Sequence, residues 1–443
     1  MVAEVKREKI VAIYAFLIMD FVQILFVSLL YLDETTLFVV GIDFSRSNPL
    51  VSISLFFAII VMQIILVYFT AVQTLRQGDL VELHPTYDTE TVWKGRYSRE
   101  SIVNWTLNLA KKSGVSVSKV YLMNSPLPNA FTFSLPFLGS VVVVHSNTLE
   151  VLNEAEVKAI ITHELGHIKN QDSIIQIFTR MPSFFVDLIY LYVYFRIGLG
   201  VVNAVLISGD LYLAGIRLVA LGGFFMLSRI LAAVSRFFMQ KASRAAELLS
   251  DYHAASVLGQ EATINALIRL GQRVETITVL IDEIRWLESL NPERTSTIAN
   301  AELMRMITQY PLDGIDEVNA REVAPDVFLS TRLTHMRKVY GVELSDEQIR
   351  KAVEPAIPGL HKKRAKAEPD SEPLKEPQTV DWRKVDYDKD RRLSKEELAD
   401  LLKLLRENPQ KMLFDREVGV NFHTLGHPDF RRRVLFIADE FGM

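Results

Sequence analysis

Four apolar stretches constrain the fold of this chain more than any other feature of its sequence. A helix needs about 20 mostly apolar residues to cross the hydrocarbon core of a bilayer. The four stretches reach that length and cover approximately Ile10–Leu32, Pro49–Val72, Phe184–Ile207 and Leu211–Val234. A hydrophobic content of 49% and a positive mean hydropathy agree with a membrane protein. The sequence therefore predicts a mainly α membrane protein with four transmembrane helices, arranged as two hairpins.

The charges that flank these stretches predict their orientation. Cations lie before the first stretch and after the second, at Lys6, Arg7, Lys9 and Arg76. The linker 33–48 is mainly acidic, and the linker 208–210 contains no cation. Because cytoplasmic flanks carry the excess of lysine and arginine, we expect both termini in the cytoplasm. This orientation predicts a multi-pass protein of the cell membrane.

Charged residues also lie inside the predicted spans. Asp20 is near the middle of the first span, and Arg196 is near the middle of the third. A charge at this depth is costly unless it faces protein or water, so we expect Asp20 and Arg196 to pair. The alternative is that the third and fourth spans are partly interfacial or line a wet cavity.

An HExxH motif at residues 163–167 lies in a stretch, residues 153–169, that is expected to be helical. The four-residue spacing places His163 and His167 on one helical face, where both imidazoles can bind one metal ion. Glu164 would face a water molecule on that ion, as a general base must. The alternative is a surface helix with two solvated histidines.

A second helical segment offers a third metal ligand. Glu247 and Asp251 are one turn apart, so they share a face. Glu247 would complete a site of three protein ligands, and Asp251 would accept a hydrogen bond from a ligating histidine. The alternative is that both carboxylates form surface ion pairs with Arg244. The chain contains no cysteine, which excludes a thiolate zinc site.

With these motifs, the chain resembles the HtpX-type membrane zinc metallopeptidases, which are related to the CAAX prenyl endopeptidases and the Oma-type proteases. The matching pieces are residues 128–131, the HExxH motif, Asp172, Ser243 to Asp251, and His427 with Arg433. The resemblance implies one catalytic zinc ion, with His163, His167 and Glu247 as ligands and Glu164 as base. Residues of about 270–420 match nothing in the family's pattern.

The segment before the HExxH helix indicates an α+β domain, and the resemblance implies that it is a protease domain of the zincin type, in the HExxH gluzincin group. Lys119–Met123 and Ser140–His145 are short and rich in apolar, β-branched or aromatic residues, as strands are. Val141–Val144 would be either an edge strand that binds an extended substrate or a buried strand under the catalytic helix.

The sequence also predicts how the chain is divided. A transmembrane hairpin occupies 1–75, and protease segments at 76–180 and 241–350 lie on either side of a second hairpin at 181–240. A linker at 351–380 and a C-terminal segment at 381–443 follow.

Three further residues are candidates for contacts with the substrate or the transition state. By resemblance, Asn129 borders the cleft, and His427 or Arg433 donates a hydrogen bond to the developing oxyanion. The alternatives are a simple turn at Asn129 and a solvated helix start around His427 and Arg433. A second, less faithful copy of this tail pattern includes His335.

Residues 386–397 match an EF-hand calcium loop at several of its ligand positions. The ligands would come from Asp386, Asp388, Asp390, Arg392, Ser394 and Glu397. Arg391 stands where the sharp turn normally requires glycine, and the sequence contains no second loop of this kind. The alternative to a Ca²⁺ site is a capped, solvated helix start.

These observations predict a zinc metalloendopeptidase that cleaves unfolded or damaged membrane proteins at the cytoplasmic face. Glu164 would assist the attack of a zinc-bound water on the scissile carbonyl. Other interpretations are CAAX-type processing of prenylated peptides and a non-catalytic zinc-binding membrane scaffold. The expected partners are polypeptide substrates and the lipid bilayer. A net charge of −4 gives no electrostatic case for nucleic acid, and the sequence does not fix an oligomeric state.

Overall fold

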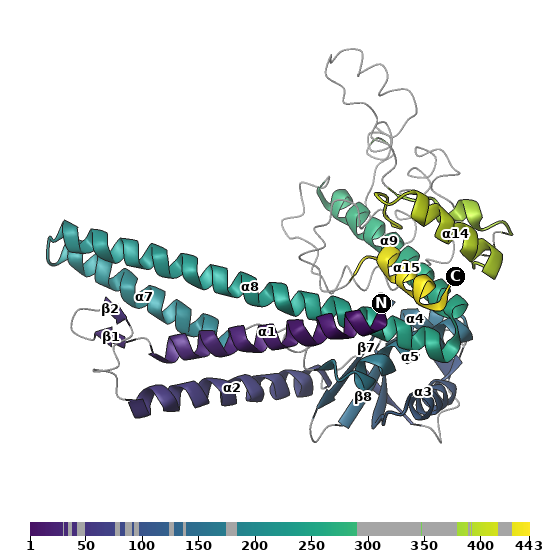
Figure 1. Ribbon diagram of the computed structural model, residues 1–443, viewed down its shortest axis with the longest axis horizontal. Coiled ribbons are helices and arrows are strands. Elements are labelled where there is room, and N and C mark those ends of the chain that lie inside the picture. Colours follow the sequence, from purple (N-terminus) through teal and green to yellow (C-terminus); the bar gives the residue numbers. More distant parts are fainter. Residues whose placement is uncertain are drawn as a thin grey trace, which may run out of the picture.

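The computed structural model shows a mainly helical protein, in which a bundle of long apolar helices extends from an α+β part (Figure 1). The structure describes residues 1–29, 31–33, 38–41, 49–75, 80–84, 91–92, 97–123, 128–135, 139–173, 184–289, 347, 379–388, 390, 392–414 and 428–443.

The bundle consists of four helices, as the apolar stretches predict. They are α1 (Val2–Leu29), α2 (Pro49–Leu75), α7 (Phe184–Leu206) and α8 (Leu211–Leu258). Within the described residues, three helical segments are long and apolar enough to cross a membrane: Val2–Leu29, Leu50–Thr70 and Leu211–Leu258. The apolar part of α7 is shorter, Tyr190–Leu206. Many large apolar side chains on these helices stay exposed, Phe69 and Val219 among them, as expected for surfaces that face lipid rather than water.

Two polar side chains inside the bundle, Asp20 and Arg217, form hydrogen bonds that the sequence did not predict. Asp20 accepts a hydrogen bond from the Gln63 side chain of α2, at 3.5 Å. The predicted pairing of Asp20 with Arg196 is therefore wrong. Asp20 instead contacts the neutral amide of Gln63, on α2. Arg217 of α8 is buried, and its guanidinium donates to the Gly200 carbonyl of α7 at 2.5 Å. This hydrogen bond lowers the cost of burying the charged side chain.

Helix α8 continues without a break from the bundle into the α+β part (Figure 1). At 1.5 Å per residue, its 48 residues span about 72 Å. The sequence predicted a boundary between residues 240 and 241, but the helix crosses that point. Its N-terminal half is mostly exposed, whereas residues from Ala242 to Ala255 are mostly buried. The same rigid helix thus carries both the fourth apolar span and Glu247.

A four-stranded sheet in the order β3-β6-β8-β7 supports the α+β part. Its strands are β3 (Leu80–Leu83), β6 (Lys119–Met123), β7 (Ala130–Leu135) and β8 (Gly139–His145). Strand β8 pairs in parallel with β6 and antiparallel with β7, and Val141–Val144 are buried. The two predicted strands are confirmed, but Val141–Val144 is not an edge. The edge strands are β3 and β7.

Helices cover one face of this sheet. The main core joins α3 (Arg99–Ser113), α4 (Ser146–Val151) and α5 (Glu154–Lys169) to the sheet through Ile102, Val142, Val144 and Leu165. The remaining strands form two small ribbons, β1 (Tyr31–Asp33) with β2 (Phe38–Gly41) and β4 (Thr91–Val92) with β5 (Tyr97–Ser98). The sheet and its core fix the position of α5, which contains the HExxH motif.

The C-terminal elements pack on α9 (Gln260–Ser289) (Figure 1). They are a 3-10 turn η3 (Trp382–Val385), α14 (Lys395–Glu407) and α15 (Phe430–Phe441). Their shared core includes the buried side chains Ile264, Leu267, Leu398 and Ile437. Asn265 of α9 also exchanges two hydrogen bonds with the Leu393 backbone. We name residues 379–414 and 428–443 the C-terminal lobe.

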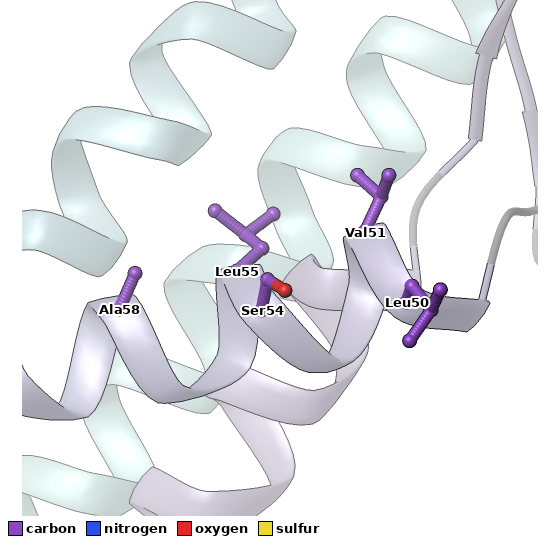
Figure 2. A pocket seen from close by; sticks show the side chains of 5 residues that line it. All are labelled: Leu50, Val51, Ser54, Leu55 and Ala58. Carbon is purple, nitrogen blue, oxygen red and sulfur yellow. The ribbon is translucent and has the colours of Figure 1, made fainter.

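Figure 2 shows a pocket at the start of α2, lined by Leu50, Val51, Ser54, Leu55 and Ala58. Ser54 contributes the one hydroxyl among these residues, and none of them carries a charge. The pocket therefore supplies neither a metal ligand nor a general base, and the chemistry must be sought at α5.

Candidate metal centre

Helix α5 presents the HExxH motif from a buried position. A capping box fixes its start: the Asn153 side chain accepts from the Glu156 N–H, and the Glu156 carboxylate accepts from the Asn153 N–H. The predicted helix is thus confirmed. His163, Glu164 and His167 each expose less than a tenth of their surface, so the alternative of two solvated histidines is wrong.

The two histidines meet Glu247 of α8. The Nε2 atoms of His163 and His167 are 3.2 Å apart. The Glu247 carboxylate oxygens lie 3.5 Å from His163 Nε2 and 3.6 Å from His167 Nε2. Zinc bonds of about 2.0–2.1 Å in tetrahedral geometry place neighbouring ligand atoms about 3.3 Å apart. The three side chains therefore converge as zinc ligands would.

Gly166 allows the helices to approach this closely. A Cβ atom at this position would lie 2.9 Å from Ser250 Cα of α8, which is closer than real side chains come. Because Ser250 follows Glu247 by less than one turn, the same close contact brings Glu247 to the histidines.

Each histidine has a carboxylate beside its other ring nitrogen. His163 Nδ1 lies 2.8 Å from Asp251 Oδ1, and His167 Nδ1 lies 3.0 Å from Asp172 Oδ2. Both carboxylates are fully buried. A proton on each Nδ1, facing its carboxylate, would leave the Nε2 lone pairs directed at the metal position.

Arg433 of α15 holds Asp251 in place. Its Nε and Nη2 atoms donate to the two Asp251 oxygens, each at 2.7 Å, and Nη2 lies 3.7 Å from Glu247 Oε2. Burial raises the pKa of Asp251, but Arg433 and His163 outweigh it and lower that pKa. Burial lowers the pKa of Arg433, but Asp251, Glu247 and Glu164 outweigh it and raise that pKa. The alternative of a solvated arginine is wrong for Arg433.

The charges around the site favour a divalent cation. Among the described residues, four buried carboxylates lie around the site: Asp172, Glu164, Glu247 and Asp251. Two cations pair with them, namely Lys9, which is buried, and Arg433, whose side chain is 12% exposed. The difference is two negative charges, which a zinc ion would neutralise. Without a metal, burial lowers the pKa of His163, but Asp251 and Glu247 outweigh it and raise that pKa to about 10. The protein thus draws a positive charge to this position.

The other predicted contact residues have separate outcomes. Asn129 is exposed, and its backbone carbonyl accepts from the His145 N–H and the Thr148 hydroxyl. This turn closes the start of β7. His427 and the second tail candidate, with His335, lie outside the described residues. The roles predicted for Asn129 and His427 stay predictions.

The predicted calcium loop lies between η3 and α14. Asp386, Asp388 and Asp390 offer oxygen atoms within 4.8 Å of one another. Glu397 accepts from the backbone of Tyr387 and Ser394 and forms a capping box with Ser394, as in the alternative interpretation. The side chain of Arg392 donates to Glu156 at the start of α5. The loop thus contacts the α5 helix, while calcium binding stays a prediction.

Sequence reasoning missed one residue of this site, Lys9 of α1. In the sequence Lys9 is only a flanking charge of the first span, and no local pattern connects it to residues more than 160 positions away. Asp172, which it contacts, follows the HExxH motif closely and was the available signal.

Comparisons with known proteins agree with this geometry. Residues 98–323, about half of the chain, match the model of peptidase family M48. A protease HtpX homolog of Aeropyrum pernix is 29% identical over 229 residues, which cover 49% of this chain and 64% of that protein. A homolog of Methylacidiphilum infernorum is 25% identical over 237 residues, or 51% and 72% of the two chains. Protease HtpX of Idiomarina loihiensis is 28% identical over 184 residues, or 40% and 60%.

The residues that match the family model contain the HExxH motif, Glu247 and Asp251. The chain spans less than two thirds of the length of the Aeropyrum protein. The His-His-Glu cluster, the apolar helices and the family match point the same way. The chain belongs to peptidase family M48, the HtpX-like membrane zinc metallopeptidases.

Proposed function

We propose that this chain is a membrane-anchored zinc endopeptidase. The convergence of His163, His167 and Glu247 at the spacing of zinc ligands carries the proposal. In the proposal these three side chains hold one zinc ion, while Asp251 and Asp172 orient the histidines. Zinc bound there would lower the pKa of a water molecule towards about 7 and polarise the scissile carbonyl.

The protein groups then handle the proton. Glu164 follows the first histidine on α5 and is buried beside the ligands, so it can take a proton from the attacking water and deliver it to the leaving amine. Arg433 uses two of its nitrogens for Asp251, which favours a positioning role for it. His427 remains the other candidate donor to the oxyanion.

Strand β7 is the proposed site for an extended substrate. Asn129 accepts from the His145 N–H, whereas the Ser134 N–H donates to Ser173 rather than to β8. In an antiparallel pair these directions alternate, so the backbone groups of Ala130 and Thr132 point away from β8. A peptide could pair with them by β-augmentation.

The apolar helices suggest the substrate class. Helix α8 joins the bundle to Glu247 without a break, so the metal centre stays attached to the membrane. With the orientation that the flanking cations favour, the centre lies at the cytoplasmic face. We propose that unfolded or damaged membrane proteins are cleaved there, as quality control.

The test is to purify the full chain in detergent and to measure zinc content and cleavage of an unfolded polypeptide. The comparison is Glu164→Gln, with Glu154→Gln as a control, because Glu154 lies exposed on the same helix. We expect zinc in all three proteins and cleavage slowed on the order of 10²–10⁴-fold in Glu164→Gln alone.

Other outcomes separate the alternatives. Zinc without cleavage in the wild type would favour a scaffold, and cleavage restricted to a prenylated peptide would favour CAAX-type processing. A wild-type protein that binds no zinc would refute the ligand assignment itself.

A further inference from the structure

Lys9 lies on the first apolar helix, yet it reaches the metal centre. Its side chain is almost fully buried, pairs with Asp172 Oδ1 and donates to the Asn170 carbonyl at 3.0 Å. The other Asp172 oxygen, Oδ2, lies 3.0 Å from His167 Nδ1. The contacts thus run in one line from α1 through Asp172 to a proposed zinc ligand.

The position of Lys9 also explains why the turn after α5 holds its shape. Asn170 is the C-cap of α5, and Gln171 has a φ of 56°, in the left-handed region. The last carbonyls of a helix lack partners within the helix and favour a nearby cation. Lys9 supplies that cation, and in the same place it neutralises the buried Asp172 carboxylate.

The other histidine is oriented in a similar way from the opposite end of the chain. Arg433 of α15 pairs with Asp251, which faces His163. The start of α1 and the helix α15 lie side by side (Figure 1), and the Val2 N–H donates to Glu440 at 2.9 Å. Each proposed zinc-binding histidine is therefore held by a carboxylate, and each carboxylate by a cation from a terminal helix.

We propose that Lys9 is a positioning residue of the metal centre, which fixes Asp172 so that His167 directs Nε2 at the metal. The proposal rests on the proposed zinc site. It makes the first membrane helix part of that site rather than only an anchor. Any movement of α1 relative to α5 would then change zinc affinity.

The test uses the full chain in detergent and measures zinc affinity by competition with a chelator. Lys9→Met removes the charge and keeps the length, Lys9→Arg keeps the charge, and Lys6→Met is the control, because Lys6 is exposed on the same helix. We expect zinc affinity to fall about 10- to 100-fold in Lys9→Met, to recover largely in Lys9→Arg and to stay unchanged in Lys6→Met. The absorption bands of the Co²⁺-loaded protein should change only in Lys9→Met.

A double-mutant cycle with Asp172→Asn distinguishes positioning from a loss of fold. If Lys9 acts through Asp172, Lys9→Met should weaken zinc binding no further once Asp172→Asn is present. Full additivity of the two changes, or wild-type affinity and Co²⁺ bands in Lys9→Met, would overturn the proposal and leave the zinc site standing. Absence of zinc from the wild type would instead overturn the proposed function.

Discussion

Gly166 shows how a single residue inside the HExxH motif sets the geometry of the metal centre. A methyl group there would meet the Ser250 backbone at 2.9 Å, and a helix backbone cannot move without its neighbours. We expect Gly166→Ala to push α8 away from α5, to cost about 1–3 kcal/mol of stability and to weaken zinc binding. Thermal unfolding and chelator competition on the purified protein measure the two effects.

Gly215→Ala is the matched control for that change. Gly215 is also helical, but a Cβ atom there would have no neighbour within 4 Å. It should therefore leave zinc affinity unchanged. Equal affinity in Gly166→Ala and the wild type would contradict the idea that this contact positions Glu247.

Local sequence patterns predicted which residues gather in the His-His-Glu cluster, but not the residues that hold them in place. His163 and His167 share a helical face because of their spacing, and Asp251 lies one turn from Glu247, so sequence alone could group them. Lys9 could not be found in this way, because its contact with Asp172 depends on how α1 packs on α8 and so places Lys9 at the turn after α5. Arg433 was recognised as part of the tail, but its bidentate contact with Asp251 depends on where α15 docks.

Among the elements, helix α9 supports the C-terminal lobe, and the lobe in turn places Arg433 at the metal centre. Phe414 packs directly over Gly271 of α9, where a Cβ atom would lie 2.1 Å from its ring. Phe414 in turn contacts Phe430, with ring centroids 5.2 Å apart, and Phe430 begins the helix that carries Arg433. A displaced Phe414 would therefore shift the helix that holds Asp251.

We expect Gly271→Ala to lower the melting temperature and to weaken zinc binding, because the ring must move. Phe414→Leu in the same protein should restore part of both, since the smaller side chain leaves room for the methyl group. Gly223→Ala, where a Cβ atom would have open space, is the control. A Gly271→Ala protein with unchanged zinc affinity would show that the lobe and the metal centre are independent.

The packing of strands and helices explains why two predictions about neighbouring elements were wrong. Strand β8 was predictable from its run of valines and β6 from its apolar and aromatic residues. The neighbours of a strand, however, are set by the whole sheet. Four buried valines fitted both an edge and a central strand, and pairing with β6 and β7 decided for the centre. The Asp20 prediction failed for a similar reason, because sequence does not show that α2 brings Gln63 to it.

For the whole molecule, the metal centre joins parts that are far apart in the chain. The HExxH helix and Glu247 lie on either side of the second apolar hairpin, and α1 and α15 add contacts from the two ends. A zinc ion would link α5 to α8 across that hairpin. Metal binding should then stabilise the packing of α5 on α8, and with it the whole fold, rather than a single loop.

Removal of zinc should therefore lower the melting temperature of the full chain in detergent. A ligand at about 1,000 times its Kd stabilises by about 4 kcal/mol. In a domain of about 150–250 residues, about 1 kcal/mol shifts the melting temperature by about 2–4 °C, so we expect a loss on the order of 10 °C. The buried excess of negative charge gives the physical reason, since without the ion only a proton on His163 would offset part of it. Glu164→Gln should keep the zinc-dependent shift, because Glu164 is not a proposed ligand, whereas Glu247→Ala should lose it. An equal shift in Glu247→Ala would mean that zinc stabilises the protein from another site.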